Sequence, residues 1–235
     1  MYDDLINKAV DYHDDVVRNI KGIRTTQALF DDLSNDERDN EVAVAAEAAG
    51  HIPSSAPLIT RPFDYGAVIS YPFVPHNWHE TRFSDGLHYG VWYGSHDVET
   101  TVCESVYHWR LFLSDSFSTE DRTITGERRV FSVRCDGILI DLRRKERAYP
   151  QLVDRVSYAY TQGVGGYLHH QGQNGLLVRS ARSKGVNAAI LRPVCLSNVR
   201  DKCQLTYITN PAQDRVTVER QRGRVWLTLY PSRFS

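Results

Sequence analysis

The sequence lacks the features that would commit it to a membrane, to secretion or to a disulfide scaffold. No window reaches the ~18 uninterrupted apolar residues of a membrane span, and the opening MYDDLINKAVDYHDD has no basic stretch followed by an apolar core. Only four cysteines occur in 235 residues, without a C-x-x-C pair, which favours reduced thiols over a disulfide framework. We therefore expect a cytoplasmic protein.

An excess of either charge is also missing. The 28 Lys and Arg residues nearly balance 29 Asp and Glu residues, for a formal net charge of -1. Such a balance argues against a chain that coats nucleic acid or an anionic membrane by charge alone, so any anion site must be local. With 41% hydrophobic and 24% charged residues, the composition is that of a soluble globular protein with a sizeable core.

Several common signatures of catalysis and metal binding are absent. The glycine-rich stretch GVGGYLHHQGQNG lacks the Gly-Lys-Ser/Thr ending of a phosphate-binding loop, and G-x-G-x-x-G does not follow a strand. The histidine pairs 76/79 and 169/170 have no cysteine or acid partner at metal-ligand spacing, so no metal is expected. A G-x-S-x-G nucleophile motif is missing as well.

The N-terminal quarter reads as helical. Apolar residues recur at roughly helical spacing within residues 3–20, and residues 26–49 read as one or two further helices. The stretch GHIPSSAPLITRPFDYG is rich in Pro, Ser and Gly, which places a boundary near residues 50–57. We expect a helical N-terminal extension over residues 1–55 and a main domain over residues 56–235.

The main domain mixes strands and helices. Residues 149–170 carry a helical stripe, and QLTYITN, VTVER and RVWLTLY predict an antiparallel meander at the end of the chain. This order predicts an α+β fold with a mixed or antiparallel β core and flanking helices. Further strands are expected at residues 67–73, 88–94, 131–142 (one strand, or two around Asp136-Gly137), 175–178 and 187–191.

A helix is also expected over residues 97–112, with Asp97 or Ser95 near its N-cap. Glu104 lies some 200° around this helix from Val102, at ~3.6 residues per turn. It therefore points away from the core, and on pattern alone a solvated helix face is the simplest interpretation. The apolar stripe consists of Val98, Val102, Val106, Trp109 and Leu113.

The order of four residues along the chain suggests a functional site. Arg82 precedes Tyr93 by eleven residues, Tyr93 precedes Glu104 by eleven, and Ser180 follows a short strand in GLLVRSARSKGVNAAILRP. The stretches ETRFSDG, VWYGSHDVETTVCES and NGLLVRSARSKGVNAAILRP resemble the RES-domain family over approximately residues 58–195. The family is named for its arginine, glutamate and serine.

The resemblance implies a fold similar to ADP-ribosyltransferases and a toxin that consumes NAD+ and is held inactive by an Xre-like antitoxin. NAD+ is then a substrate, with no further cofactor and no direct contact with nucleic acid or a membrane; the oligomeric state stays open. The implied residues of the NAD+ pocket are Arg82, Tyr93, Glu104 and Ser180, joined by Arg61 as a second arginine and by Tyr89 as a substitute for Tyr93.

These residue types suit the pieces of NAD+. A guanidinium can hold phosphate oxygens in a fork, so Arg82 is the expected pyrophosphate anchor; the alternative is a surface ion pair with Asp85 or Glu80. Tyr93 offers an aromatic face to nicotinamide and a hydroxyl to a ribose or phosphate, or is simply a core aromatic of a strand.

Two further roles complete the expected site. Glu104 could bond a ribose hydroxyl and stabilise positive charge at the anomeric carbon, as carboxylates do in glycoside cleavage. The hydroxyl of Ser180 could bond a phosphate or ribose, or cap its own turn. The expected reaction is cleavage of the nicotinamide–ribose bond by hydrolysis or phosphorolysis; the alternatives are a protein mono-ADP-ribosyltransferase and a non-catalytic interaction module.

Overall fold

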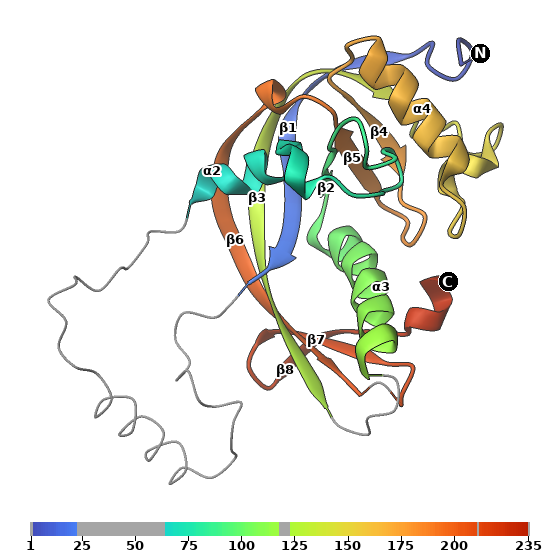
Figure 1. Ribbon diagram of the computed structural model, residues 1–235. Coiled ribbons are helices and arrows are strands. Elements are labelled where there is room, and N and C mark those ends of the chain that lie inside the picture. The colour runs from blue at the N-terminus through green and yellow to red at the C-terminus, as the bar shows by residue number, and fades with distance from the viewer. Residues whose placement is uncertain (1, 23–63, 118–122, 211, 235) are drawn as a thin grey trace, which may run out of the picture. The chain divides into compact units, whose positions relative to one another are not determined.

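One eight-stranded sheet is the frame to which the helices attach (Figure 1). The structure is a computed structural model that describes residues 2–22, 64–117, 123–210 and 212–234. Met1–Gly22 and Tyr65–Ser235 form one compact unit. The strands are β1 (Ala9–Lys21), β2 (Trp92–Ser95), β3 (Ile124–Asp141), β4 (Gly175–Arg179), β5 (Val186–Ile190), β6 (Leu196–Thr209), β7 (Val216–Gln221) and β8 (Arg224–Leu229). The helices are α2 (Tyr65–Ser70), α3 (Val98–Phe117) and α4 (Ala159–His170), with short 3-10 helices at Tyr71–Phe73, Pro75–Asn77, Pro150–Val153, Pro193–Cys195 and Pro231–Phe234.

The sheet is mixed but mostly antiparallel. Its order is β1-β2-β5-β4-β3-β6-β7-β8, and among the described strands only β3 and β4 pair in parallel. Strand β1 also pairs with β3 from Ala9 opposite Ile140 to Lys21 opposite Arg128, so strands β1 to β5 close a ring of pairings. These observations confirm the α+β fold with a mixed or antiparallel core.

Strand β1 corrects the helix predicted over residues 3–20. Alternate residues Val10, Tyr12 and Val16 contact one hydrophobic cluster, which is the period of a strand. Asp14 interrupts that alternation on the same side, and the remaining apolar residues then mimic helical spacing. Thirteen residues of ladder with β3 outweigh this local pattern, because strand formation depends on partners distant in sequence. Residues 9–21 of the expected extension are therefore a strand of the main sheet.

Two other elements differ from expectation. The strand predicted at residues 67–73 is instead helix α2, followed by the 3-10 helix Tyr71–Phe73; a short apolar run cannot distinguish these by pattern. The helix predicted from residue 149 begins only at Ala159, and Val156 is exposed. The helices predicted over residues 26–49, the boundary near 50–57 and Arg61 lie outside the described residues.

The remaining predictions hold closely. Residues 131–142 fall within the single strand β3, with no turn at Asp136-Gly137, apart from Leu142 just past its end. Strand β2 starts later than expected, at Trp92, while β4, β5 and the terminal meander β6–β8 lie where predicted. The four cysteines are free thiols.

Helix α3 begins at the expected cap. The Asp97 carboxylate accepts hydrogen bonds from the backbone N–H of Thr100 at 2.7 Å and from its hydroxyl at 2.8 Å. Such a cap satisfies a donor that the first helical turn cannot pair. The predicted apolar stripe of this helix is buried against the sheet, and its members are Val98, Val102, Val106, Trp109 and Leu113.

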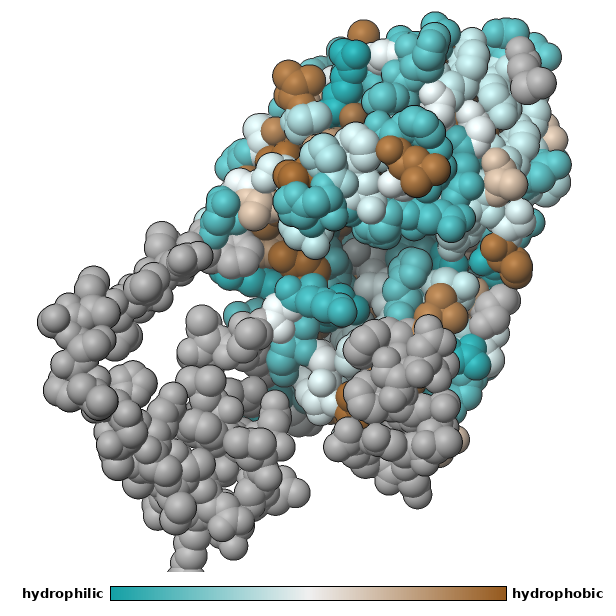
Figure 2. Space-filling view, in the orientation of Figure 1, coloured by the Kyte–Doolittle hydropathy of each residue, from teal (hydrophilic) through white to brown (hydrophobic). Residues whose placement is uncertain are grey.

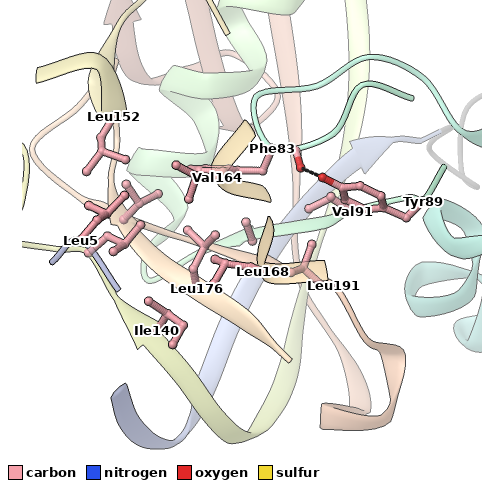
Figure 3. Packing of buried hydrophobic residues seen from close by; sticks show 13 residues of the cluster. Leu5, Phe83, Tyr89, Val91, Ile140, Leu152, Val164, Leu168, Leu176 and Leu191 are labelled. Carbon is pink, nitrogen blue, oxygen red and sulfur yellow. Dashed lines mark hydrogen bonds between the residues drawn. The ribbon is translucent and has the colours of Figure 1, made fainter. Parts of the chain in front are cut away.

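The helices cover both faces of the sheet. On β4, Leu177 contacts the cluster that contains Val68 of α2, whereas Leu176 and Val178 contact the cluster that contains α4. Alternate side chains of a strand point to opposite faces, so α2 and α4 lie on opposite sides of β4. Figure 3 shows the α4 cluster, in which Val164 and Leu168 of the helix meet Leu176 of the sheet.

The surface is largely polar. In Figure 2, hydrophobic residues are scattered among hydrophilic ones on the face shown rather than gathered into one patch. Large exposed apolar side chains include Leu87, Val156 and Val194, which belong to separate parts of the fold. Scattered exposure of this kind is ordinary for folded proteins. Among the described residues, no helix has both the length and the apolar character to cross a membrane.

Candidate active site

A cavity of about 400 Å³ is bordered by α3, β1, β2, β5 and the connection before β2. This volume lies in the range of pockets that take small molecules, about 300–1,000 Å³. Its polar lining is rich in arginine. The lining residues are Arg18, Asn19, Tyr71, Pro72, His79, Glu80, Thr81, Arg82, Phe83, Val91, Tyr93, Gly94, Ser95, Thr101, Glu104, Ser105, His108, Tyr158, Val178, Arg182 and Asn187.

One side of α3 faces this cavity. Thr101, Glu104, Ser105 and His108 all line it, at the three- and four-residue spacing that aligns side chains along a helix. The face that pattern alone assigns to solvent is therefore a cavity wall, and the Glu104 side chain is only 22% exposed. The apolar stripe on the other side holds the helix in this orientation.

Four residues form a hydrogen-bonded group that we call the carboxylate cluster: Glu104, Ser180, Arg182 and Asn187. The Oε1 atom of Glu104 accepts bonds from the Ser180 hydroxyl at 2.7 Å and from Asn187 Nδ2 at 2.8 Å. Its Oε2 atom accepts one from Arg182 Nη1 at 2.9 Å. A carboxylate has about four acceptor positions, so one position on Oε2 stays open.

Ser180 supports Glu104 from behind the cavity wall and does not line the cavity. Its hydroxyl also accepts the backbone N–H groups of Arg182 at 3.0 Å and Ser183 at 2.9 Å. A hydroxyl has one donor and two acceptor positions, so all three are used. The turn-capping alternative therefore describes Ser180, and its hydroxyl has no position left for a phosphate or ribose.

The turn after Ser180 packs tightly against the start of α3. A Cβ atom on Gly185 would lie 1.8 Å from Oγ1 of Thr100, so only glycine fits without a shift. The Ser183 hydroxyl donates to the same Thr100 oxygen at 3.2 Å. This contact fixes the turn relative to the helix that carries Glu104.

Arg182 is the cation of the carboxylate cluster. Its side chain is 1% exposed, its Nη2 donates to the Tyr158 hydroxyl at 3.1 Å, and its guanidinium lies 3.7 Å from the centre of the Tyr107 ring. A buried guanidinium is stable only with a counter-ion and further partners, and Glu104 supplies that charge.

Arg82 lines the same cavity without a carboxylate partner among the described residues. Its Nη1 donates to the carbonyls of Asp154 at 2.7 Å and Leu152 at 3.4 Å, and its guanidinium lies 4.7 Å from the centre of the Tyr158 ring. Its Nη2 is buried and has no acceptor, and burial lowers the pKa of the group.

The predicted surface ion pair of Arg82 does not form. Asp85 instead bonds His88 at 2.8 Å, and Glu80 accepts a bond from Gln162 at 2.9 Å. The guanidinium is therefore held by neutral groups and keeps its charge available to the cavity.

Tyr93 lines the cavity, and its hydroxyl is engaged by other protein groups. The hydroxyl donates to Thr81 Oγ1 at 3.0 Å and accepts the backbone N–H of Phe83 at 2.9 Å. Burial raises the pKa of Tyr93 to about 12, so the hydroxyl stays protonated near neutral pH. The ring is therefore better placed than the hydroxyl for ligand contact.

Tyr89 does not belong to the cavity. Its ring stacks on His169 at 4.2 Å between ring centres, and its hydroxyl donates to the Phe83 carbonyl at 2.6 Å (Figure 3). The residue is buried in the α4 cluster and does not line the cavity. The structure therefore does not bring Tyr89 to the cavity that Tyr93 lines, because its ring and its hydroxyl both contact the core.

Strand β1 supplies two lining residues that sequence reasoning missed, Arg18 and Asn19. The amide nitrogen of Asn19 donates to Ser105 Oγ at 3.1 Å and to the Tyr207 hydroxyl at 2.9 Å, which ties α3 to β1 and β6. Its Oδ1 atom is buried without a donor. Had residues 9–21 been predicted as a strand of the sheet, Arg18 and Asn19 could have been expected near the site.

Buried polar atoms without partners gather around the cavity. In the part of the chain that the structure describes they include Arg18 Nε, Asn19 Oδ1, Arg82 Nη2 and Arg182 Nε, all on lining residues. Native proteins pair most buried polar atoms, so such a concentration indicates a site for a polar ligand. No group of three or more His, Cys, Asp or Glu side chains among the described residues could hold a metal ion.

Comparison with known proteins adds a family match. The family model described as "RES domain" matches residues 49–210, which is more than half of the chain. No curated protein matches the sequence. Among solved structures, a chain of the M. tuberculosis MbcT-MbcA toxin-antitoxin complex matches with 13% identity and a TM-score of 0.46, over 87% of this chain and 88% of that chain.

Proposed function

This chain belongs to the RES-domain family, and from that premise we propose that it cleaves the nicotinamide–ribose bond of NAD+. The observation that carries the proposal is the cavity itself, where the held carboxylate of Glu104 shares one lining with Arg18 and Arg82, two arginines that have no carboxylate partner in the described part of the chain. We call Arg18 and Arg82 the uncompensated arginines. NAD+ combines the groups that this lining suits: an anionic diphosphate, hydroxyl-bearing riboses and a cationic aromatic ring.

The carboxylate cluster favours cleavage at the anomeric carbon. Breaking the bond to nicotinamide leaves positive charge on the ribose, and a fixed carboxylate stabilises that charge without reorganising. Ser180, Arg182 and Asn187 hold Glu104 through three bonds. The open position on Oε2 can accept a ribose hydroxyl or a proton of the attacking nucleophile.

The other parts of the substrate find partners on the remaining lining. Arg82 can bind diphosphate oxygens through the donors that its backbone contacts leave free. The Tyr93 ring can stack on the nicotinamide, whose positive charge is attracted to an aromatic face. Nicotinamide then leaves as a neutral molecule, which takes the bonding electrons with it.

The attacking group distinguishes the finer alternatives. Water would give ADP-ribose, inorganic phosphate would give ADP-ribose carrying a phosphate on the anomeric carbon, and a protein side chain would retain the ADP-ribosyl group. The toxin role and an Xre-like antitoxin partner are further parts of the proposal and rest on the family resemblance.

The test is a time course of the purified protein with NAD+, with and without phosphate, in which products are separated by chromatography. We expect release of nicotinamide in step with loss of NAD+, and the second product identifies the acceptor. Labelled NAD+ followed on a protein gel detects transfer to a protein. A folded preparation that leaves NAD+ intact under every condition would refute the proposal.

A further inference from the structure

A second cavity, of about 300 Å³, adjoins the cavity that Glu104 lines. The two spaces have three lining residues in common, Asn19, Ser105 and His108. The lining of the second cavity is completed by Lys21 at the end of β1, Trp109 of α3 and Arg128 of β3. Its volume lies at the lower end of the range for small-molecule sites, about 300–1,000 Å³.

The charge of the second cavity is positive. Lys21 and Arg128 both line it, and its lining contains no aspartate or glutamate from the described part of the chain. His108 adds an imidazole, which can take up a proton near neutral pH. A lining of this kind attracts an anion.

The two cations are direct neighbours across the sheet. In the antiparallel register of β1 and β3, Lys21 stands opposite Arg128. Side chains of directly opposite residues project from the same face of a sheet, and like charges in such a pair destabilise it. An anion bound between Lys21 and Arg128 would replace this repulsion with two attractions.

The guanidinium of Arg128 is buried but leaves its donors unused. The residue is 9% exposed, and its guanidinium lies 5.3 Å from the centre of the Tyr207 ring. Toward the described residues this guanidinium forms neither an ion pair nor a hydrogen bond, although it carries five N–H donors. Burial lowers the pKa of Arg128, as expected for a cation that lacks a counter-ion.

A purely structural role explains Arg128 less well. Its contact with the Tyr207 ring recovers less free energy than the burial of an unpaired ion costs. A neutral side chain at this position would also avoid the repulsion from Lys21. A ligand that uses both the charge and the planar fork accounts for the guanidinium.

We propose that the second cavity binds a phosphate-type anion between Arg128 and Lys21. The fork of Arg128 suits two oxygens of one phosphate group, and the ammonium of Lys21 adds a point charge. This site is additional to the cavity proposed for NAD+ and does not depend on that proposal. Inorganic phosphate and the phosphate of a small monoester offer the same oxygens, and the experiment separates these two sources.

The experiment measures anion binding by the full-length protein without NAD+. Calorimetry is carried out with inorganic phosphate and, separately, with ribose 5-phosphate. We expect at least about tenfold weaker binding in Arg128→Gln and a smaller loss in Lys21→Gln, since each variant loses a charge-assisted contact. Arg82→Gln, in the first cavity, and Arg224→Gln, at an exposed position of β8, are the controls and should bind like the parent.

The source of the anion follows from the two titrations. Tighter binding of ribose 5-phosphate than of phosphate, with both weakened in Arg128→Gln, supports a site for a phosphate ester. Binding of inorganic phosphate alone, weakened in the same variant, supports a site for the free ion.

Three results would overturn the proposal. The first is a parent protein that shows no saturable binding of either anion. The second is parent-like affinity in Arg128→Gln. The third is binding that is lost in Arg82→Gln but kept in Arg128→Gln, which assigns the anion to the first cavity. If Arg128→Gln does not fold, parent-like affinity in Lys21→Gln, at an exposed position, overturns the proposal instead. Because NAD+ is absent, none of these results depends on whether the chain cleaves it.

Discussion

The carboxylate cluster and the uncompensated arginines meet at one cavity but differ in how their charges are compensated. Within the cluster, Glu104 accepts three bonds and Arg182 has both a counter-ion and a ring partner. Arg18 and Arg82 instead have no carboxylate partner among the described residues, donate to backbone carbonyls and lie over aromatic rings. All three arginines keep one buried N–H group without an acceptor. Under the proposed function, the first group is preorganised to act on NAD+, and the bound substrate supplies the anion that the second group lacks.

The largest expected effect breaks the cluster at its centre. Glu104→Gln removes the charge at nearly constant shape, so NAD+ turnover should fall by about a hundredfold to a thousandfold. The new amide also faces Arg182, so stability should fall by about 1–3 kcal/mol while the fold is kept. Turnover and circular dichroism check both points. Glu99→Gln, at an exposed position in the first turn of α3, is the matched control and should retain activity.

A pair of arginine variants tests the comparison directly. Arg182→Met leaves Glu104 without its cation and should cost about 3 kcal/mol of unfolding free energy. Arg82→Met removes only contacts to carbonyls and a ring, so its cost should be about 1 kcal/mol, while NAD+ binding weakens about tenfold. Urea denaturation and calorimetry measure these quantities. Equal losses of unfolding free energy in the two variants would contradict the difference in charge compensation between Arg182 and Arg82.

The turn that follows Ser180 positions the carboxylate cluster, and this role can be tested without changing a charged residue. Gly185→Ala forces the turn after Ser180 away from Thr100, so it should cost about 2 kcal/mol and lower turnover. Gly166→Ala in α4 meets its nearest neighbour, the Tyr89 hydroxyl, at an ordinary 3.9 Å. That control should stabilise the helix by up to about 1 kcal/mol. Thermal unfolding and a turnover assay report both effects.

An ion pair outside the cavity sharpens the contrast between stability and activity. Asp141 bonds Arg143 Nε at 2.8 Å and Lys8 Nζ at 2.8 Å, and these cations hold the pKa of its carboxyl well below its usual range. The unfolded carboxyl binds a proton more readily, so this stabilisation is present at neutral pH and is lost as pH falls below about 4. Asp141→Asn should cost about 2 kcal/mol at pH 7, and less at pH 3, with turnover unchanged.

The smallest expected effect concerns Tyr89. Tyr89→Phe removes a hydrogen bond to the Phe83 carbonyl and should cost about 1 kcal/mol. Because Tyr89 does not line the cavity, KM and kcat should match those of the parent. A change in KM for NAD+ greater than about threefold, or about 0.6 kcal/mol of binding free energy, would indicate that Tyr89 contributes to the site after all.

Some elements of the fold could be predicted from local sequence patterns and others could not. Helix α3 was predicted because its cap at Asp97 and its apolar stripe are local signals of a regular helix. Strand β1 was mistaken for a helix because Asp14 and Arg18 interrupt its period-two pattern, and its pairing with β3 joins residues more than a hundred positions apart. The α2 segment failed for a simpler reason, since six residues hold too little pattern to distinguish a helix from a strand.

The sequence predicted some members of the candidate site, but it missed Arg18 and Asn19 and said less about the hydrogen bonds within the site. Arg82, Tyr93 and Glu104 line one cavity and Ser180 bonds Glu104, while their roles toward NAD+ stay predictions. The sequence could not reveal that the Ser180 hydroxyl has no free position, or that the Tyr93 hydroxyl is engaged by Thr81 and a backbone N–H. Hydrogen-bond saturation depends on neighbours that only folding brings near.

By itself the sequence determined the balanced charge, the amphipathic helix that carries Glu104 and the spacing that marks the family. Tertiary structure alone decided that the polar side of this helix meets a cavity instead of solvent, and that Arg18 reaches the same cavity from β1. The physical reason is that periodicity and capping act over a few residues, whereas burial and charge compensation are set by contacts between distant strands.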